Sequence, residues 1–153
     1  MWQRSQTVYL SLLVITMLLT IVFPFAYYPI AGSGAGFSIF GISSNEFNVD
    51  VWFPYYISVG LSVGISLFAI TQFKNRKRQL ALGKINYLVL LLTLTMLFLD
   101  VTSVAEQFKL DTNEIEYNFI GFMLPAISLA FQFLANRGIK KDEELIKSVD
   151  RLR

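Results

Sequence analysis

The chain has 153 residues, of which 54% are hydrophobic and 16% are charged, and its mean hydropathy is +0.53. Soluble domains have roughly 45–50% apolar and about 25% charged residues. The composition therefore indicates a membrane protein, with part of its surface in contact with lipid. Cysteine and histidine are absent, which excludes disulfides, thiolate nucleophiles, imidazole acid–base catalysis and the usual zinc sites.

Four apolar stretches divide the chain, and each can cross the roughly 30 Å hydrocarbon core of a bilayer as a helix with a rise of about 1.5 Å per residue. A cleaved signal peptide is the alternative for the first stretch. Signal cores have about 7–15 apolar residues and this stretch is longer, which favours a retained helix. We therefore expect spans at about residues 8–28, 51–73, 80–100 and 117–136.

The basic residues indicate an orientation. All but Lys109 of the thirteen Lys and Arg residues flank the spans on one side, and such residues stay in the cytoplasm. The loop at 74–79, the tail at 137–153 and both ends are thus expected inside, and the loops at 31–50 and 101–116 outside. The sequence predicts an all-α membrane protein, a single domain over residues 1–153 built as an antiparallel bundle of four transmembrane helices.

Two short elements are expected outside the spans. Residues 37–42 and 47–49 alternate apolar and polar around a plausible turn at 43–45, which predicts an extracytoplasmic β-hairpin. Gly138 indicates a helix end, and the residues after it predict an amphipathic cytoplasmic helix resting on anionic lipid headgroups. A solvated tail is the alternative, because so short a helix is marginal alone.

Small and polar residues follow helical spacing in two of the expected spans. In the second span, Ser58, Ser62 and Ser66 share one face, and Gly60 and Gly64 lie roughly opposite. Small residues let helix backbones approach closely, so we expect packing on both faces, with a serine-lined polar path as the alternative.

The fourth span carries a stripe that favours the bundle interior. Gly121, Pro125, Ser128 and Gln132 recur along one side of it, and polar groups within a membrane avoid lipid. Hydrogen bonds between helices are expected there, and contact with a ligand is the alternative.

Asp100 is the carboxylate nearest to the expected hydrocarbon. About 24 Å of helix separates it from Lys84, whose long side chain can reach the headgroups. We therefore expect Asp100 at the outer interface. The alternative joins Asp100 with Glu106 in an outward-facing cation or proton site.

The basic loop contains Lys74, Arg76, Lys77 and Arg78. Between two spans it is most simply an orientation signal, and binding of anionic lipid is the alternative; no nucleic-acid partner is expected. No Walker, dinucleotide-binding or HExxH motif occurs, so we expect no cofactor, no metal and no enzymatic activity.

The two ends of the chain carry a family resemblance. Residues 1–10 read MWQRSQTVYL and residues 135–153 read ANRGIKKDEELIKSVDRLR. They resemble an uncharacterised bacterial family of small four-span membrane proteins, a domain-of-unknown-function group of one Gram-negative phylum. The resemblance implies an inner-membrane location and the same four-helix layout, and it implies no activity. If the motif that identifies the family lies in the cytoplasmic end, we expect an interaction surface there that includes Arg137, Asp142, Glu143 and Arg151. The alternative is a salt-bridged helix that rests on lipid.

Together these patterns favour a non-enzymatic scaffold or accessory subunit of a membrane assembly. Its expected partners are the bilayer, anionic headgroups, other membrane proteins or a second copy of the chain. The alternative is a small oligomeric transporter or channel for a cation or a small polar or amphipathic solute, using Asp100, Glu106 and Gln132.

Overall fold

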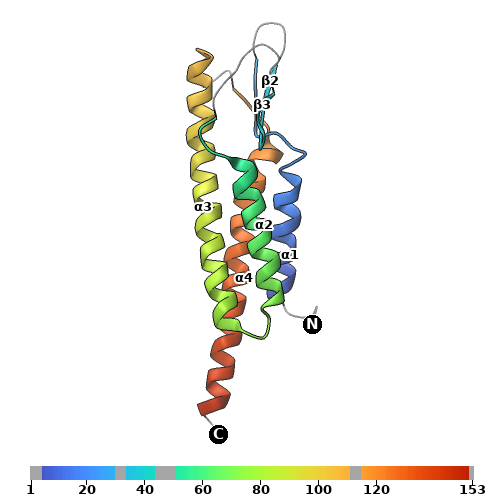
Figure 1. The fold of residues 1–153 in the computed structure, drawn as a ribbon, viewed down its shortest axis with the longest axis vertical. Coiled ribbons are helices and arrows are strands. Elements are labelled where there is room, and N and C mark those ends of the chain that lie inside the picture. Colours follow the sequence, from blue (N-terminus) through green and yellow to red (C-terminus); the bar gives the residue numbers. More distant parts are fainter. Residues whose placement is uncertain (1–4, 30–33, 44–50, 111–114, 152–153) are drawn as a thin grey trace.

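Four helices and four short strands make up the structure, a computed structural model that describes residues 5–29, 34–43, 51–110 and 115–151. In chain order they are α1 (Ser5–Leu19), β1 (Ala26–Tyr28), β2 (Ala35–Ser38), β3 (Gly41–Ser43), α2 (Tyr55–Thr71), α3 (Arg76–Gln107), β4 (Glu116–Tyr117) and α4 (Phe119–Arg151). The helices run up and down along one long axis (Figure 1). Each helix packs against two others, in the cyclic order α1, α2, α3, α4.

The two ends of the bundle differ in structure and charge. The strands gather at one end, here called the sheet end, while α1 begins and α4 leaves the bundle at the other (Figure 1). This second end is here called the basic end, because it carries Arg76, Lys77, Arg78, Lys84, Arg137, Lys140 and Lys141.

The prediction of an all-α bundle with four transmembrane helices is wrong. A four-stranded antiparallel sheet, ordered β3-β2-β1-β4, is part of the fold. Of the described helices, only α3 and α4 are long and apolar enough to cross a membrane. Helices α1 and α2 have 15 and 17 residues. Their lengths are about 22 and 26 Å at 1.5 Å per residue, short of the roughly 30 Å hydrocarbon core.

Pro24 explains why the first apolar stretch is not one helix. Proline lacks a backbone N–H and disfavours helical geometry in the residue before it. Helix α1 ends at Leu19, and the chain then turns and becomes extended at β1. Strand β1 pairs antiparallel with β2 on one side and with β4 on the other. The expected span at 8–28 is therefore a helix, a turn and a strand.

The hairpin lies earlier in the chain than the sequence predicts. Strands β2 and β3 pair around a turn at Ile39 and Phe40. Gly41 follows with a φ of 105°, a left-handed conformation that glycine adopts without steric cost. The predicted second arm, residues 47–49, lies outside the described residues. The added strands β1 and β4 supply the support that an isolated hairpin lacks in water.

The predicted separate tail helix is instead the end of α4, which continues through Gly138. Ile139 is fully buried, and the Arg76 guanidinium donates a hydrogen bond to the backbone carbonyl of Asp142. These contacts offset the cost of a glycine within a helix, about 1 kcal/mol relative to alanine. Helix α3 likewise begins earlier than predicted, since the Asn75 side chain accepts a hydrogen bond from the Arg78 N–H at 3.2 Å and caps it.

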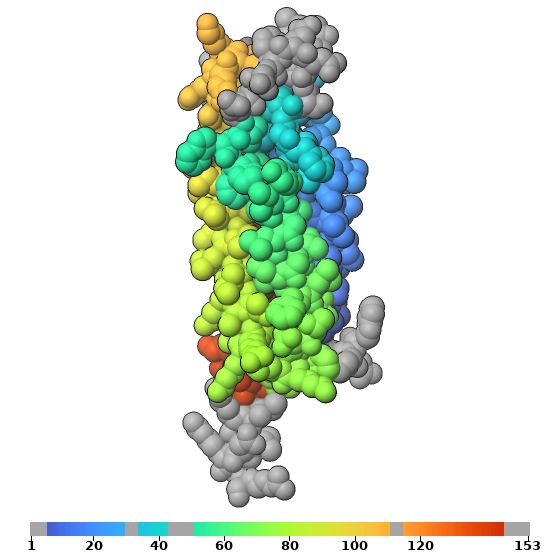
Figure 2. All heavy atoms as spheres, viewed as in Figure 1, coloured from blue at the N-terminus to red at the C-terminus, as the bar shows by residue number. Residues whose placement is uncertain are grey.

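Apolar side chains cover much of the outside of the helices. In the most apolar 18-residue windows of α3 and α4, 39% of the residues are buried, so most point outward. Ile15 of α1, Leu61 of α2, Leu88 of α3 and Ile127 of α4 are all exposed. The helices that carry them run along an elongated body (Figure 2). Soluble monomers rarely expose large contiguous apolar patches, and acyl chains would cover such a surface.

Aromatic rings join the sheet to the helices. The rings of Phe25 and Phe37 lie 5.5 Å apart, and each lies 5.6 Å from the ring of Tyr55 at the start of α2. All three side chains are buried. Gly121, in the first turn of α4, lets the carbonyl of Pro24 lie against the helix backbone, because a Cβ there would overlap that oxygen.

We expect Gly121→Ala to lower the free energy of unfolding by about 1–3 kcal/mol, since the added methyl group has to displace the backbone at Pro24. The measurement is denaturant unfolding in detergent, followed by circular dichroism. Gly60→Ala is the matched control, because a Cβ at Gly60 meets no atom within 4 Å. Equal stability of the two variants would contradict the close contact.

Candidate functional site

A chain of hydrogen-bonded side chains crosses the bundle interior. The Asn86 amide of α3 donates to Ser66 Oγ of α2 at 2.9 Å and to Gln132 Oε1 of α4 at 2.7 Å. All three residues are fully buried. Gln132 Nε2 then donates to Asn136 Oδ1 at 3.0 Å. Ser66, Asn86, Gln132 and Asn136 are here called the polar chain.

A glycine makes room for the outer end of the polar chain. Asn136 Nδ2 donates to the backbone carbonyl of Gly83 at 3.2 Å, and a Cβ on Gly83 would overlap Asn136 Oδ1. Helices α3 and α4 therefore lie close together where their polar groups meet. Sequence reasoning missed Asn86, Gly83 and Asn136. The sequence offered a signal for two of them: Asn86 is the one amide within the third apolar stretch, and Asn136 is the last residue of the expected fourth span.

Several buried polar atoms have no hydrogen-bond partner within the described residues. They are the side-chain oxygen and nitrogen of Gln6 and of Gln79, Ser62 Oγ and Asn86 Oδ1. Gln6 and Gln79 lie in the first turns of α1 and α3, at the basic end. An unpaired buried polar group costs about 1–3 kcal/mol. These groups are therefore an energetic cost within the bundle.

The two small-residue faces of α2 have different surroundings. Ser58, Ser62 and Ser66 are buried within the bundle, whereas Gly60 and Gly64 are exposed and a Cβ on either would meet no atom within 4 Å. On α4, Gly121 and Pro125 are buried, and Ser128 Oγ lies 2.7 Å from Thr16 Oγ1 of α1.

Asp100 lies near the sheet end, apart from the polar chain. Its Oδ2 accepts a hydrogen bond from the Tyr55 hydroxyl at 2.7 Å, and 7% of the residue is exposed. A hollow of about 430 Å³ opens beside it, lined by Trp52, Met96, Leu99, Asp100, Ser103, Val104 and Gln107. Glu106 is exposed and does not line this hollow, so the structure does not join the two carboxylates in one site.

Tyr28 makes a second hydroxyl contact at this end. Its hydroxyl donates to the Val101 carbonyl at 3.1 Å. Burial, with smaller contributions from Tyr117 and Asp100, raises the pKa of Tyr28 above its ordinary value. The hydroxyl therefore stays protonated and keeps its role as a donor at neutral pH.

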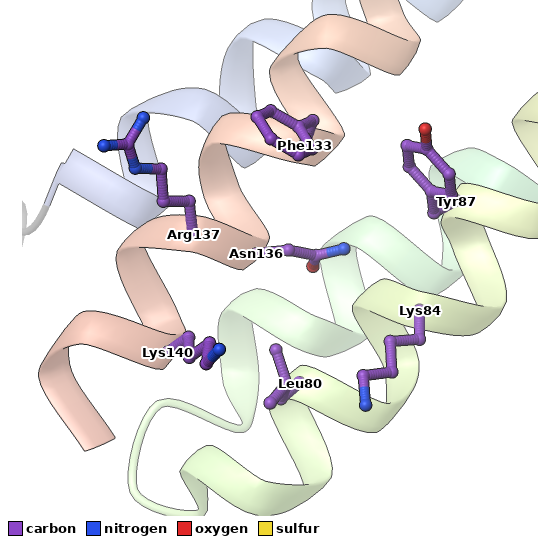
Figure 3. A pocket seen from close by; sticks show the side chains of 7 residues that line it. All are labelled: Leu80, Lys84, Tyr87, Phe133, Asn136, Arg137 and Lys140. Atoms are coloured by element: carbon purple, nitrogen blue, oxygen red, sulfur yellow. The ribbon is translucent and has the colours of Figure 1, made fainter. Parts of the chain in front are cut away.

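The basic groove is a cavity of about 590 Å³ between α3 and α4 near the basic end. Its lining residues are Leu80, Lys84, Tyr87, Phe133, Asn136, Arg137 and Lys140 (Figure 3). Asn136 lies between the two helices and also belongs to the polar chain. The groove thus combines three basic residues, two aromatic rings and one end of the polar chain in its lining, with the Arg137 guanidinium directed away from the two lysines in Figure 3.

The other predicted cytoplasmic residues lie around this end without lining the groove. Lys74, Lys77 and Arg78 are exposed, and Asp142 and Glu143 are half-buried. The side chain of Arg151 lies outside the described ones. In the described part of the chain, no group of three or more His, Cys, Asp or Glu residues could hold a metal ion.

We expect Asn86→Leu to lower the free energy of unfolding by about 1–3 kcal/mol, because it leaves Ser66 and Gln132 without their shared donor. Unfolding in detergent measures the change. Thr95→Val is the control on the same helix, since the exposed Thr95 hydroxyl bonds only the carbonyl of Leu91 in its own helix. If Asn86→Leu were as stable as the control, the polar chain would not hold the helices together.

A second prediction concerns the Tyr55–Asp100 bond. Tyr55→Phe is expected to lower the free energy of unfolding by about 1.5–3 kcal/mol, the usual value for a hydrogen bond to a charged group, while Tyr56→Phe, an exposed neighbour, changes it little. In a double-mutant cycle with Asp100→Asn, the double variant should lose less free energy of unfolding than the sum of the losses in the two single variants. Full additivity would show that the two side chains do not interact.

Comparison with known proteins places the chain in a family. Searches of curated proteins and of solved structures found no match. A family model described as a domain of unknown function, DUF4293, matches residues 2–152. This confirms the expected membership in a family without an assigned function, while the match carries no information on phylum or membrane. The chain belongs to the DUF4293 family of domains of unknown function.

Proposed function

We propose that this protein is a non-enzymatic scaffold or accessory subunit of a membrane assembly, and that it acts by binding a membrane-spanning helix of a partner protein. The observation that carries the proposal is the glycine face of α2, here defined as Gly60 and Gly64 with the exposed apolar residues Ile57, Leu61 and Leu67 beside them.

The helical glycines differ in whether a Cβ at their position would overlap a neighbouring group. At Gly83 and Gly121 a Cβ would overlap a neighbouring group of the same chain, which explains both glycines by internal packing. At Gly60 and Gly64 a Cβ would meet no atom within 4 Å. Each glycine within a helix costs about 1 kcal/mol relative to alanine, so an intermolecular contact is the physical use that remains for this pair.

The surroundings of the glycine face favour a helix as the partner. Small residues four apart allow two helix backbones to approach closely, and within hydrocarbon such packing replaces the hydrophobic effect. The flanking apolar side chains would lie against the same helix. An apolar membrane helix with small residues of its own matches this shape and chemistry.

We also propose that the protein resides in a bacterial inner membrane, with the basic end on the cytoplasmic side. The proposal requires α3 and α4 to cross and α2 to lie beside them in the bilayer, where the bundle packs it against α3. It is supported by the length and hydropathy of these two helices, by their outward apolar side chains and by the tendency of basic flanks to remain in the cytoplasm.

A small transporter or channel is the second candidate, and the unpaired polar atoms at Gln6, Gln79 and Ser62 are the observation that favours it. A polar route would have to continue toward Asp100. Against such a route, Met17, Leu90 and Leu97 place fully buried apolar side chains in the interior, beside the buried hydroxyls of Ser62 and Thr93. Flux into proteoliposomes separates the two functions, because a scaffold conducts none of a broad panel of cations and polar solutes.

Site-specific crosslinking in native membranes tests the scaffold proposal. A photoreactive residue at Leu61 is expected to crosslink to a membrane protein, whereas the same residue at Leu92, an exposed position of α3, should give no such product. Gly64→Leu should abolish the Leu61 crosslink, because its side chain holds the partner helix away. Thr95→Leu, on another exposed surface, should leave the crosslink intact.

Two results would contradict this proposal. One is a Leu61 crosslink that Gly64→Leu does not reduce, at equal protein level. The other is a crosslink only to a second copy of this chain, which would replace the partner protein with a homo-oligomer.

A further inference from the structure

We propose that the basic groove binds the phosphate-bearing headgroup of an anionic phospholipid, whose acyl chains run along α3 and α4 toward the sheet end. This inference rests on the proposed membrane location, and it does not depend on the partner helix at the glycine face.

The charge of the lining favours a phosphate. Three of the seven lining residues, Lys84, Arg137 and Lys140, are cations, and none is acidic. The Glu144 carboxylate lies 3.9 Å from Lys140 Nζ, and both side chains are largely exposed. Such exposed pairs contribute little, so Lys140 can turn to an anion in the groove. Lys and Arg bind phosphate oxygens through short, charge-assisted hydrogen bonds.

The order of the lining residues along the helices matches an amphipathic molecule. Lys140 of α4 lies nearest the basic end, and Phe133 lies two turns farther into the bundle. On α3, Lys84 is likewise followed by Tyr87, and Figure 3 shows the two rings on one side of the lysines. Beyond the rings, the exposed Leu91, one turn after Tyr87 on the same face of α3, continues the apolar surface. A free phosphate would use only the cationic part.

The groove has a size suited to a headgroup. Its volume of about 590 Å³ falls within the roughly 300–1,000 Å³ of small-molecule sites in proteins. It can hold a phosphodiester with its glycerol unit and the first carbons of the acyl chains. The remaining carbons would lie on the apolar outside of α3 and α4.

Asn136 connects the groove to the bundle interior. Its Nδ2 group has two protons, of which one bonds the Gly83 carbonyl. The second proton is left for a phosphate oxygen. Because Asn136 Oδ1 already accepts from Gln132, a bound headgroup would steady the whole polar chain, and binding to the folded state should raise the unfolding temperature.

The test is native mass spectrometry and thermal unfolding of the detergent-purified full-length protein with added phosphatidylglycerol, phosphatidylcholine or glycerol 3-phosphate. We expect phosphatidylglycerol to be retained and to raise the unfolding temperature, and phosphatidylcholine to do neither. Glycerol 3-phosphate should not displace the lipid, since it lacks the acyl chains.

Charge-matched double variants provide the control. Lys84→Gln with Lys140→Gln is expected to weaken phosphatidylglycerol binding about tenfold, whereas Lys109→Gln with Lys141→Gln, exposed positions that do not line the groove, should change it less than about twofold. Unfolding without lipid shows whether each variant folds. If a groove variant fails to fold, Lys84→Arg with Lys140→Arg should fold and keep the affinity for phosphatidylglycerol.

Three outcomes would overturn the proposal: equal losses in the two double variants, equal binding of phosphatidylcholine, or displacement of the lipid by glycerol 3-phosphate. A failed scaffold function gives a different result. The Gly64→Leu variant would then keep its Leu61 crosslink, while the groove would still retain phosphatidylglycerol in purified protein.

Discussion

The hydrogen bonds from the Asn86 amide to Ser66 and Gln132 are the constraint on which the bundle depends most directly. They join three helices at one level of a fully buried interior. Where the outside of a bundle is as apolar as its inside, hydrophobic burial distinguishes poorly between alternative packings. Directional bonds between buried amides fix the rotation and height of α2, α3 and α4, since any other register leaves these groups unpaired.

The two ends of the molecule differ in structure, because buried aromatic rings hold the sheet end together and basic side chains line the groove at the other end. At the sheet end, Pro24 stops α1, and the chain forms β1, which the buried rings of Phe25, Phe37 and Tyr55 hold onto the helices. At the basic end, α3 and α4 approach across Gly83, and the cations lie on the groove beside them. The bundle thus has an aromatic cap at one end and a charged, open surface at the other.

The proposed roles use the two surfaces that packing within the bundle does not fill, the glycine face and the basic groove. The polar chain and the serine face are occupied by contacts within the bundle, while the glycine face and the basic groove are not. Asn136 belongs to both the polar chain and the groove. A ligand in the groove would therefore reach the interior through the Asn136 side chain.

The sequence by itself determined the family, the apolar character, the helical periodicity and the segregation of charge. Helical periodicity places Ser58, Ser62 and Ser66 on one face in any fold, because it follows from local geometry. Only the tertiary structure decided that Asn86 meets Gln132, that Asp100 meets Tyr55 and not Glu106, and that residues 26–28 form a strand. Hydropathy measures how much a segment favours an apolar solvent. It does not distinguish a helix from a short buried strand, and it contains no information on which distant side chain will satisfy a buried amide.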